Sequence, residues 1–262
     1  MLEYAEFFNH TIHERYAENR LTVLFGYRIL HNFTLKILAL DASTEYLSLA
    51  LWLDGKVESL DMHAGQTHSQ IILPKIRELL DASNLQMRDI NGIAFGEGPG
   101  SFTGLRISCG VAQGLAFGAN IPVVAVSTLL SLAHASGRDK VIACLDARMG
   151  EVYFAAYENS AEGWKEISAP GLYKPESLPA LPSDGWVGVG SGWDAYAEPL
   201  QSAYQSQLAE CLTGKYPSAS AMAELSVSRF EAGLGLPAAQ AAPVYIRNKV
   251  AFTSSEREKS ST

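Results

Sequence analysis

From residue 35 onward, short apolar runs alternate with segments of helical spacing, and this pattern predicts an α/β fold. The dipeptide Asp54-Gly55 separates two apolar runs and is typical of a two-residue hairpin. The pattern therefore predicts three antiparallel strands followed by alternating helices and strands. The expected strands are 36–40, 47–53, 56–62, 90–95 and 123–126, and the expected helices are 69–80, 102–117 and 129–135.

After the polar turn at 136–139, a second series of apolar runs begins that resembles the first series from residue 35. Strands are expected at 141–146 and 151–157, with Met149-Gly150 between them. We therefore expect two related lobes, the second shorter and more irregular. Later elements are a strand from Trp186 into a glycine turn and a helix at 219–230. The expected division is an extension at 1–34, an N-terminal lobe at 35–137, a C-terminal lobe at 138–250 and a polar tail at 251–262.

Three turns at the ends of predicted strands carry the residue types that bind nucleotides. Gly96 to Gly104 joins a buried strand to a helix, and glycine lets free backbone N–H groups approach an anion at the helix N-terminus. Asp41 to Thr44 can hold a magnesium ion through water, or it can close the hairpin as an Asx turn. With the late turn at 188–192, they favour a nucleotide cleft between the lobes. The residues expected near the nucleotide are Asp41, Ser43, Thr44, Gly98, Gly100 and Ser101.

The helix after the glycine turn carries two stripes of small residues. Each interior glycine destabilises a helix by about 1 kcal/mol relative to alanine, so close packing must offset this loss. The packing partner is either the chain's own sheet or a helix of another chain, and one stripe facing inward with the other outward satisfies both. The stripes are Gly104, Ser108, Ala112, Ala116 and, beside them, Gly110, Gly114, Gly118.

Charge and cysteine content limit the classes of function. The 262 residues include 28 acidic and 20 basic side chains, for a net charge of −8. Such a chain binds nucleic acid poorly by itself, because phosphate contacts need clustered Lys and Arg. The cysteines Cys109, Cys144 and Cys211 are isolated, which is typical of reduced thiols in the cytoplasm. No apolar run approaches the ~20 residues of a membrane span.

The sequence predicts no metal site and no catalytic residue. The histidines lack partners at ligand spacing, and nothing pairs a nucleophile with a general base. Asp146 and Arg148 are instead expected to form an ion pair that fixes the turn between two strands.

Four motifs stand in order along the chain: Lys36–Thr44 (KILALDAST), Gly98–Arg106 (GPGSFTGLR), Asp146–Tyr153 (DARMGEVY) and Pro243–Asn248 (PVYIRN). Together they resemble those of the TsaB (YeaZ) family, the bacterial tRNA threonylcarbamoyladenosine biosynthesis proteins. The resemblance covers residues 35 to 250 and implies the actin-like ATPase (ASKHA) fold with two RNase-H-like lobes. Family members begin near Leu35, so we expect that residues 1–33 lie outside the family fold and that translation starts at Leu35.

The resemblance also implies partners. The chain would activate a TsaD-type catalytic paralogue beside a TsaE-type small ATPase, and the complex would modify tRNAs that read ANN codons. It would contact tRNA through the complex, need no cofactor of its own beyond ATP or ADP at the interface of the complex, and form a homodimer when alone. In the family, the first two helices of the N-terminal lobe form the dimer face. The residues predicted for this interface are Ile72, Ile76, Leu79, Arg106, Ala112 and Ala116.

The resemblance further implies that this chain does not catalyse the transfer. The catalytic paralogue carries a His-x-x-x-His pair just after its fifth strand, and here Thr128 and Leu132 occupy those positions. Neither residue replaces an imidazole as a metal ligand. The alternative is a stand-alone enzyme of the same fold, either an ATP-dependent phosphotransferase or a metallopeptidase.

Overall fold

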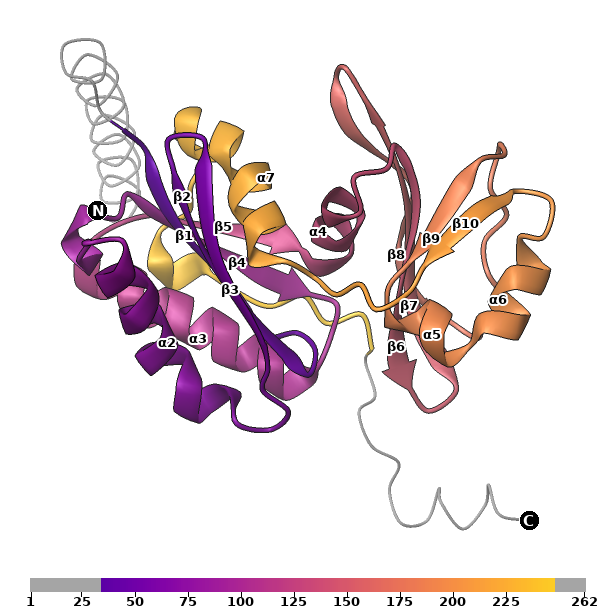
Figure 1. Cartoon of the computed structure of the whole chain (residues 1–262), viewed down its shortest axis with the longest axis horizontal. Coiled ribbons are helices and arrows are strands. Elements are labelled where there is room, and N and C mark those ends of the chain that lie inside the picture. Colours follow the sequence, from indigo (N-terminus) through magenta and orange to yellow (C-terminus); the bar gives the residue numbers. More distant parts are fainter. Residues whose placement is uncertain (1–33, 248–262) are drawn as a thin grey trace, which may run out of the picture. The chain divides into compact units, whose positions relative to one another are not determined.

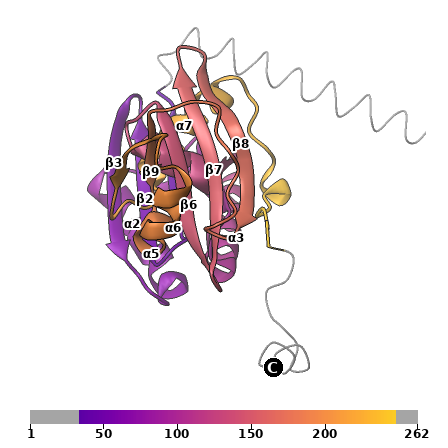
Figure 2. The same ribbon diagram turned by 90° about the vertical axis from the view of Figure 1, so that its right-hand side faces the viewer.

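The computed structural model describes residues 34–247. The predictions for residues 1–33 and for the polar tail fall outside these residues. From Lys36 onward the described residues belong to one compact unit, which holds two sheets with helices on their faces (Figures 1 and 2). Within 34–247, no helix is long and apolar enough to cross a membrane.

The first sheet has the strand order β3-β2-β1-β4-β5. Strand β1 pairs antiparallel with β2 and parallel with β4, so the predicted hairpins precede a parallel crossover. Helices α2 and α3 contact each other and this sheet. The elements are β1 (Lys36–Asp41), β2 (Tyr46–Leu53), β3 (Lys56–His63), α2 (His68–Ala82), η1 (Met87–Asp89), β4 (Gly92–Gly98), α3 (Phe102–Ala119) and β5 (Val123–Ser127).

The second sheet repeats this topology. Its order is β10-β9-β6-β7-β8, so β6 takes the place of β1, with an antiparallel neighbour on one side and a parallel neighbour on the other. The prediction of two related lobes is confirmed. The elements are β6 (Lys140–Arg148), β7 (Glu151–Ser160), β8 (Gly163–Tyr173), β9 (Trp186–Val189), α5 (Ser191–Ala195), α6 (Ala197–Ala203) and β10 (Leu208–Leu212).

Two further helices, α4 (Thr128–Ala135) and α7 (Ala219–Glu231), pack across the boundary expected at residue 137. Helix α4 follows the first sheet in sequence, yet its Leu129 and Leu132 belong to the core of the second sheet. Helix α7 follows the second sheet and packs on β1, β2, β4 and β5 of the first. The two helices also contact each other. Each lobe is therefore completed by a helix from the other half of the sequence.

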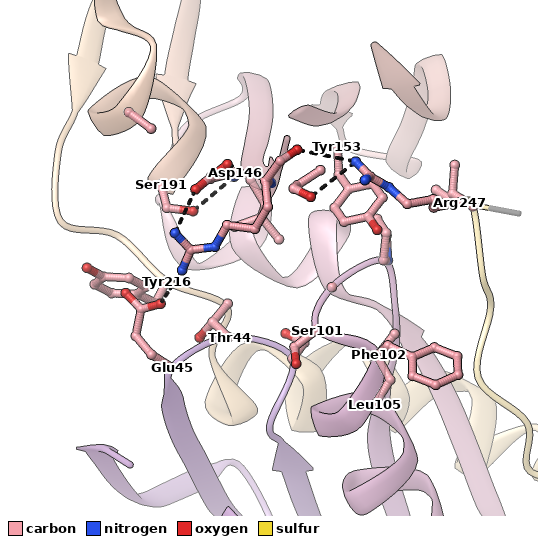
Figure 3. Close-up of a pocket in the computed structure, with 18 of the residues that line it drawn as sticks. Thr44, Glu45, Ser101, Phe102, Leu105, Asp146, Tyr153, Ser191, Tyr216 and Arg247 are labelled. Atoms are coloured by element: carbon pink, nitrogen blue, oxygen red, sulfur yellow. Dashed lines mark hydrogen bonds and ion pairs between the residues drawn. The ribbon is translucent and has the colours of Figure 1, made fainter. Parts of the chain in front are cut away.

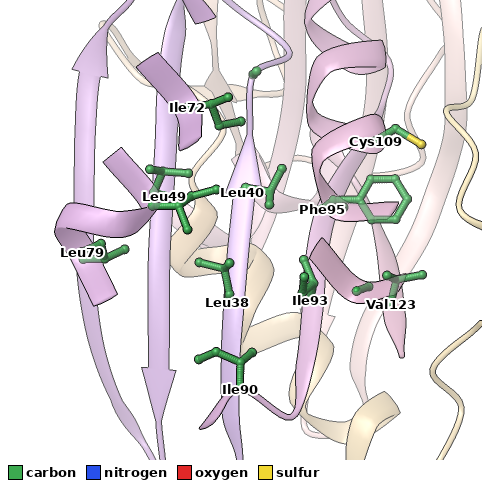
Figure 4. Close-up of a cluster of buried hydrophobic side chains, with 14 of the residues drawn as sticks. Leu38, Leu40, Leu49, Ile72, Leu79, Ile90, Ile93, Phe95, Cys109 and Val123 are labelled. Carbon is green, nitrogen blue, oxygen red and sulfur yellow. The ribbon is translucent and has the colours of Figure 1, made fainter. Parts of the chain in front are cut away.

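The core of the first lobe explains why β1 is apolar at every position between Lys36 and Asp41. Leu38 and Leu40 are fully buried beside Ile93 and Phe95 of β4, and Ile72 and Leu79 of α2 cover them (Figure 4). Burial at 0 % exposure on successive residues means that both faces of β1 are covered. Helices α2 and α3 cover one face and α7 the other, which is the arrangement expected of a parallel strand.

The second lobe contains elements that the apolar pattern did not predict. Strand β8 contains Pro170 and Gly171, two residues that are uncommon inside strands. Proline is tolerated there because β8 is the edge strand of its sheet, where an N–H can be absent without breaking a ladder. Strand β10, with Glu210 at its centre, is the opposite edge. Edge strands are partly exposed, so their sequences lack the apolar signal.

Candidate functional site

A cleft of about 660 Å³ lies between the loops of the two sheets. Its first-lobe wall contains the turn after β1 and the N-terminus of α3, and its second-lobe wall contains the β6–β7 turn and α5. Residues 244–247 close one side (Figure 3). The central strands β1 and β6 both end at this cleft, as strands do at the ligand crevices of open α/β sheets.

Asp41 closes the turn after β1 and lies behind the cleft wall. Its Oδ1 accepts hydrogen bonds from the backbone N–H of Ser43 at 3.0 Å and from the Ser43 hydroxyl at 2.7 Å. Its Oδ2 is buried without a hydrogen-bond partner among the described residues, and a Cβ at Gly96 would lie 2.0 Å from it. Burial raises the pKa of Asp41 from 3.8 to about 6. The Asx turn, one of the two interpretations of this segment, is what the structure shows.

The glycine turn packs directly on the Asp41 turn. The backbone N–H of Ser101 donates to the carbonyl oxygen of Ser43 at 2.7 Å. A Cβ at Gly100 would lie 2.6 Å from the same oxygen, and one at Gly104 would lie 1.8 Å from the Ala42 oxygen. The glycines therefore allow backbone to approach backbone. The arrangement does not fit a phosphate between the two turns, because the chain's own carbonyl groups occupy that space.

One backbone N–H at the N-terminus of α3 is also bonded from within the chain. The Ser101 hydroxyl accepts a hydrogen bond from the Gly104 N–H at 3.3 Å, which is an N-cap. Of the six residues expected near a nucleotide, Ser43, Thr44, Gly100 and Ser101 line the cleft, whereas Asp41 and Gly98 lie outside its lining. Whether a nucleotide binds near them stays a prediction.

The β6–β7 turn forms the opposite wall. Arg148 Nη1 lies 3.2 Å from Asp146 Oδ2, which confirms the predicted ion pair, and Asp146 Oδ1 accepts a hydrogen bond from the Arg148 N–H at 2.8 Å. The Arg148 guanidinium also lies 4.0 Å from Glu45 of the first lobe, so it spans the cleft. Its side chain is 78 % exposed, so water screens both contacts.

Arg247 is the residue of this site to which the sequence analysis gave no role. It lies in the fourth family motif and is the last described residue. Its Nη2 donates to Glu151 Oε2 at 2.6 Å, and its side chain is only 13 % exposed. Burial raises the pKa of the nearby Tyr153, and the Arg247 charge opposes this rise. Apart from its place in the fourth motif, the sequence carries no signal that this charge is buried and paired, because its partner Glu151 lies 96 positions away.

Thr128 and Leu132, the residues at the positions of the paralogue's histidine pair, are both structural. The Thr128 hydroxyl accepts a hydrogen bond from the Gly98 N–H at 3.1 Å, and Leu132 is fully buried in the core of the second lobe. Leu132 also lies where a Cβ at Gly190 would clash, at 2.6 Å. Within 34–247, no three His, Cys, Asp or Glu side chains gather in a way that could hold a metal ion.

The side chains predicted for a partner interface lie mostly in the core. Five of them are at most 6 % exposed and belong to the core of the first lobe; these are Ile72, Ile76, Leu79, Ala112 and Ala116. These side chains pack on the sheet beneath their helices, and whether the same pair of helices forms a partner interface stays a prediction. Arg106 is exposed, and its Nε donates to the Tyr245 hydroxyl at 3.0 Å.

The outer stripe of α3 does face solvent. Gly110, Gly114 and Gly118 are exposed, and a Cβ at each would meet nothing within 4 Å. On the same pair of helices, Leu73 is 52 % and Phe117 80 % exposed. The expected division of α3 into an inward and an outward stripe of small residues is thus present.

The repeated strand order, the two exchanged helices and the cleft at the strand ends define a class of protein, the two-lobed actin-like ATPase fold built from RNase-H-like halves. A family model described as "TsaD: tRNA N6-adenosine threonylcarbamoyltransferase" matches residues 62–253. Two solved structures from Pseudomonas aeruginosa are similar to this chain. One, described as an uncharacterized protein with similarity to peptidase YEAZ, has a TM-score of 0.75 at 37% identity and covers 81% of this chain and 100% of that chain. The other, YeaZ, has a TM-score of 0.71 at 36% identity and covers 80% and 99%.

Curated relatives define the family more narrowly. The tRNA threonylcarbamoyladenosine biosynthesis protein TsaB of Escherichia coli is 40% identical over 227 residues, which are 83% of this chain and 97% of that protein. TsaB of Haemophilus influenzae is 37% identical over 234 residues, or 83% and 96%. The chain belongs to the TsaB family, and the resemblance carried by its four motifs is confirmed.

Proposed function

We propose that this chain is a non-catalytic subunit needed for threonylcarbamoyladenosine modification of tRNAs that read ANN codons. One observation carries the proposal. The chain matches 97% of the Escherichia coli protein, whose name places it in threonylcarbamoyladenosine biosynthesis, at 40% identity. A match over nearly the whole relative, with both lobes and the cleft included, supports a shared role and not only a shared fold.

In this role the chain is the dimerisation partner and activator of a TsaD-type catalytic paralogue, beside a TsaE-type small ATPase. The match to a TsaD family model supports a pairing of two proteins of one fold. Contact with tRNA runs through the complex, because a net charge of −8 disfavours phosphate binding by this chain alone. We place the complex in the cytoplasm.

The absence of catalysis from this subunit is part of the proposal. Thr128 and Leu132 support it, since a hydroxyl bonded to the Gly98 N–H and a buried leucine leave no pair of imidazoles after β5. We likewise assign any ATP or ADP to the interface of the complex. The hydrogen bond between Ser101 and Ser43 supports this, because it closes the space where the fold's nucleotide phosphates would lie.

We place the partner on the outer face of α2 and α3, which also serves a homodimer when the chain is alone. Gly110, Gly114 and Gly118 form a flat strip on which another backbone can approach closely, and exposed Leu73 and Phe117 supply apolar area beside it. The buried residues first predicted for this face support it from beneath.

Reconstitution of tRNA modification tests the proposal. The cognate catalytic paralogue, the small ATPase, tRNA and a threonylcarbamoyl donor are combined with and without this chain, and modified nucleoside is measured after digestion. We expect modification only when the chain is present. Equal modification without it contradicts the proposal. ATP hydrolysis or peptidase activity of the purified chain that disappears in Asp41→Ala supports the stand-alone enzyme instead.

A further inference from the structure

The segment 241–247 runs along the first lobe toward the second and is attached to the first at several points (Figure 1). The Ala241 carbonyl accepts a hydrogen bond from Gln113 of α3 at 2.9 Å, and the Val244 N–H donates to the Glu97 carbonyl of β4 at 2.7 Å. The Tyr245 hydroxyl accepts from Arg106 at 3.0 Å. We call residues 241–247 the strap. Its contacts on this side involve both a helix and the sheet of the first lobe.

The aromatic contacts of Tyr245 add to this attachment. Its ring centroid lies 5.1 Å from that of Phe102, and the Arg106 guanidinium lies 3.9 Å above the Phe102 ring. Stacking of this kind holds an exposed side chain in one position. The strap therefore enters the cleft wall from a fixed point at the N-terminus of α3.

At its other end the strap contacts the second lobe through Arg247, which bonds to the β6–β7 turn, and through Ile246, which packs against the core of that lobe. Besides Glu151 at 2.6 Å, Arg247 Nη2 donates to the carbonyl oxygens of Ala147 at 3.1 Å and Arg148 at 3.3 Å (Figure 3). Its Nη1 donates to the Met149 sulfur at 2.9 Å. The planar guanidinium thus donates to several acceptors along the β6–β7 turn at once. The single ammonium group of lysine cannot reproduce this forked geometry.

The turn that Arg247 holds has an unfavourable backbone. Arg148, Met149 and Gly150 have φ values of 62°, 60° and 73° in sequence, and the first two are not glycine. Residues other than glycine rarely adopt this left-handed backbone conformation unless surrounding contacts hold them there. The contacts of Arg247 with these carbonyl groups are such contacts, so the strap end and the turn conformation depend on each other.

We propose that the strap sets the separation of the two lobes and that Arg247 is its latch on the second lobe. Besides Arg247, the lobes are joined by the α4–α7 contact, which includes the exposed His134–Glu224 pair, by the hydroxyl contact of Ser127 with Tyr157 at 3.4 Å, by the packing of Ile246, and by Arg148–Glu45 across the cleft at 4.0 Å. Exposed pairs contribute little. When Arg247 releases the turn, the β6–β7 turn relaxes and the second lobe moves away from the strap about the α4–α7 contact. The proposal concerns this chain alone and does not depend on the identity of a partner.

Spin-label distance measurements on the full chain test the latch. Labels are attached at Ser59→Cys on β3 and Ser202→Cys on α6, both exposed positions, in a Cys211→Ser background that removes the half-buried thiol. Arg247→Ala is expected to broaden the distribution of inter-lobe distances. It should also speed amide hydrogen exchange at residues 147–151 by about tenfold or more. The control Arg88→Ala, at an exposed site on η1, should change neither quantity.

Each other outcome overturns the proposal. Faster exchange in the turn with an unchanged distance distribution means that Arg247 only supports the turn. If Arg88→Ala broadens the distribution of inter-lobe distances equally, the separation of the lobes does not depend on Arg247. Should Arg247→Ala fail to fold, Arg247→Lys keeps the charge opposite Glu151 but loses the forked contacts with the turn. An unchanged distance distribution in that folded variant equally overturns the latch.

Discussion

The backbone N–H of Ser101 donates a 2.7 Å hydrogen bond to the carbonyl oxygen of Ser43, so the glycine turn of α3 is bonded to the turn after β1. In an open α/β sheet, two such turns would border a bound phosphate. In this chain the two turns are hydrogen-bonded to each other instead. The glycine-rich turn thus has a structural reason for its glycines, and this relationship leads to the first prediction.

The isolated chain is expected to bind Mg-ATP with a dissociation constant no tighter than about 1 mM. The phosphate would have to break the Ser101–Ser43 bond and displace the chain's own carbonyl groups. Isothermal titration of the purified chain measures this. A micromolar constant would show that the two turns separate to admit the nucleotide, and would contradict the assignment of nucleotide to the interface of a complex.

Two glycines of α3 are expected to respond oppositely to alanine. In Gly104→Ala, the Cβ would lie 1.8 Å from the Ala42 oxygen, so the helix and β1 must separate and stability should fall by about 1–3 kcal/mol. In Gly110→Ala the Cβ meets nothing within 4 Å, and helix propensity should raise stability by about 0.5–1 kcal/mol. Urea denaturation of both variants measures the difference. Similar losses in both would mean that Gly110 also packs closely.

Asp41 predicts a specific pH dependence of stability. Burial raises its folded pKa to about 6 from 3.8, so the folded state binds more protons than the unfolded state between these values. The free energy of unfolding should therefore fall as the pH rises from about 4 to about 6, by roughly 3 kcal/mol from this residue. Asp41→Asn should flatten this fall, because its amide does not ionise. Asp81→Asn, on the exposed surface of α2, is the matched control and should leave the slope as in the unaltered chain.

The outer face of α3 predicts the position of the partner. Gly114→Trp places a large side chain on the exposed strip without disturbing the core, and complex formation with the TsaD-type paralogue should weaken by about 10-fold or more. Ser202→Trp on the exposed surface of α6 is the control. Sedimentation or gel filtration of the mixed proteins measures the complex. Unchanged association in Gly114→Trp would place the partner elsewhere, and both variants should keep the thermal unfolding midpoint of the unaltered chain.

Much of the first lobe could be predicted because its central strands are buried on both faces. Apolar runs such as 36–40 need no tertiary information to be recognised, and Asp54-Gly55 marks its hairpin by local turn geometry. The second lobe was less predictable, because strands β8 and β10 are sheet edges whose residues alternate or include Pro170. Short helices such as α5 contain too few turns to show a helical period.

The turns of the candidate site could be predicted from the sequence, but the tertiary contacts of its residues could not. The motifs located Asp41, the glycine turn and the Asp146–Arg148 pair, since each is a local feature of a few residues. They did not show that Ile72 and Ala112 point into the core, because the direction of a helix face depends on the sheet against which the helix packs.

The sequence by itself determined the two-lobed α/β fold, the family and the presence of glycine at each close approach of the backbone, because these follow from local periodicity, turn chemistry and motif order. Only the tertiary structure decided that α4 and α7 are exchanged between the sheets and that Ser101 bonds to Ser43. It likewise decided that Arg247 reaches across 96 sequence positions to Glu151. Such contacts join residues far apart in the chain, and their geometry is fixed by how whole elements pack and not by neighbouring residues.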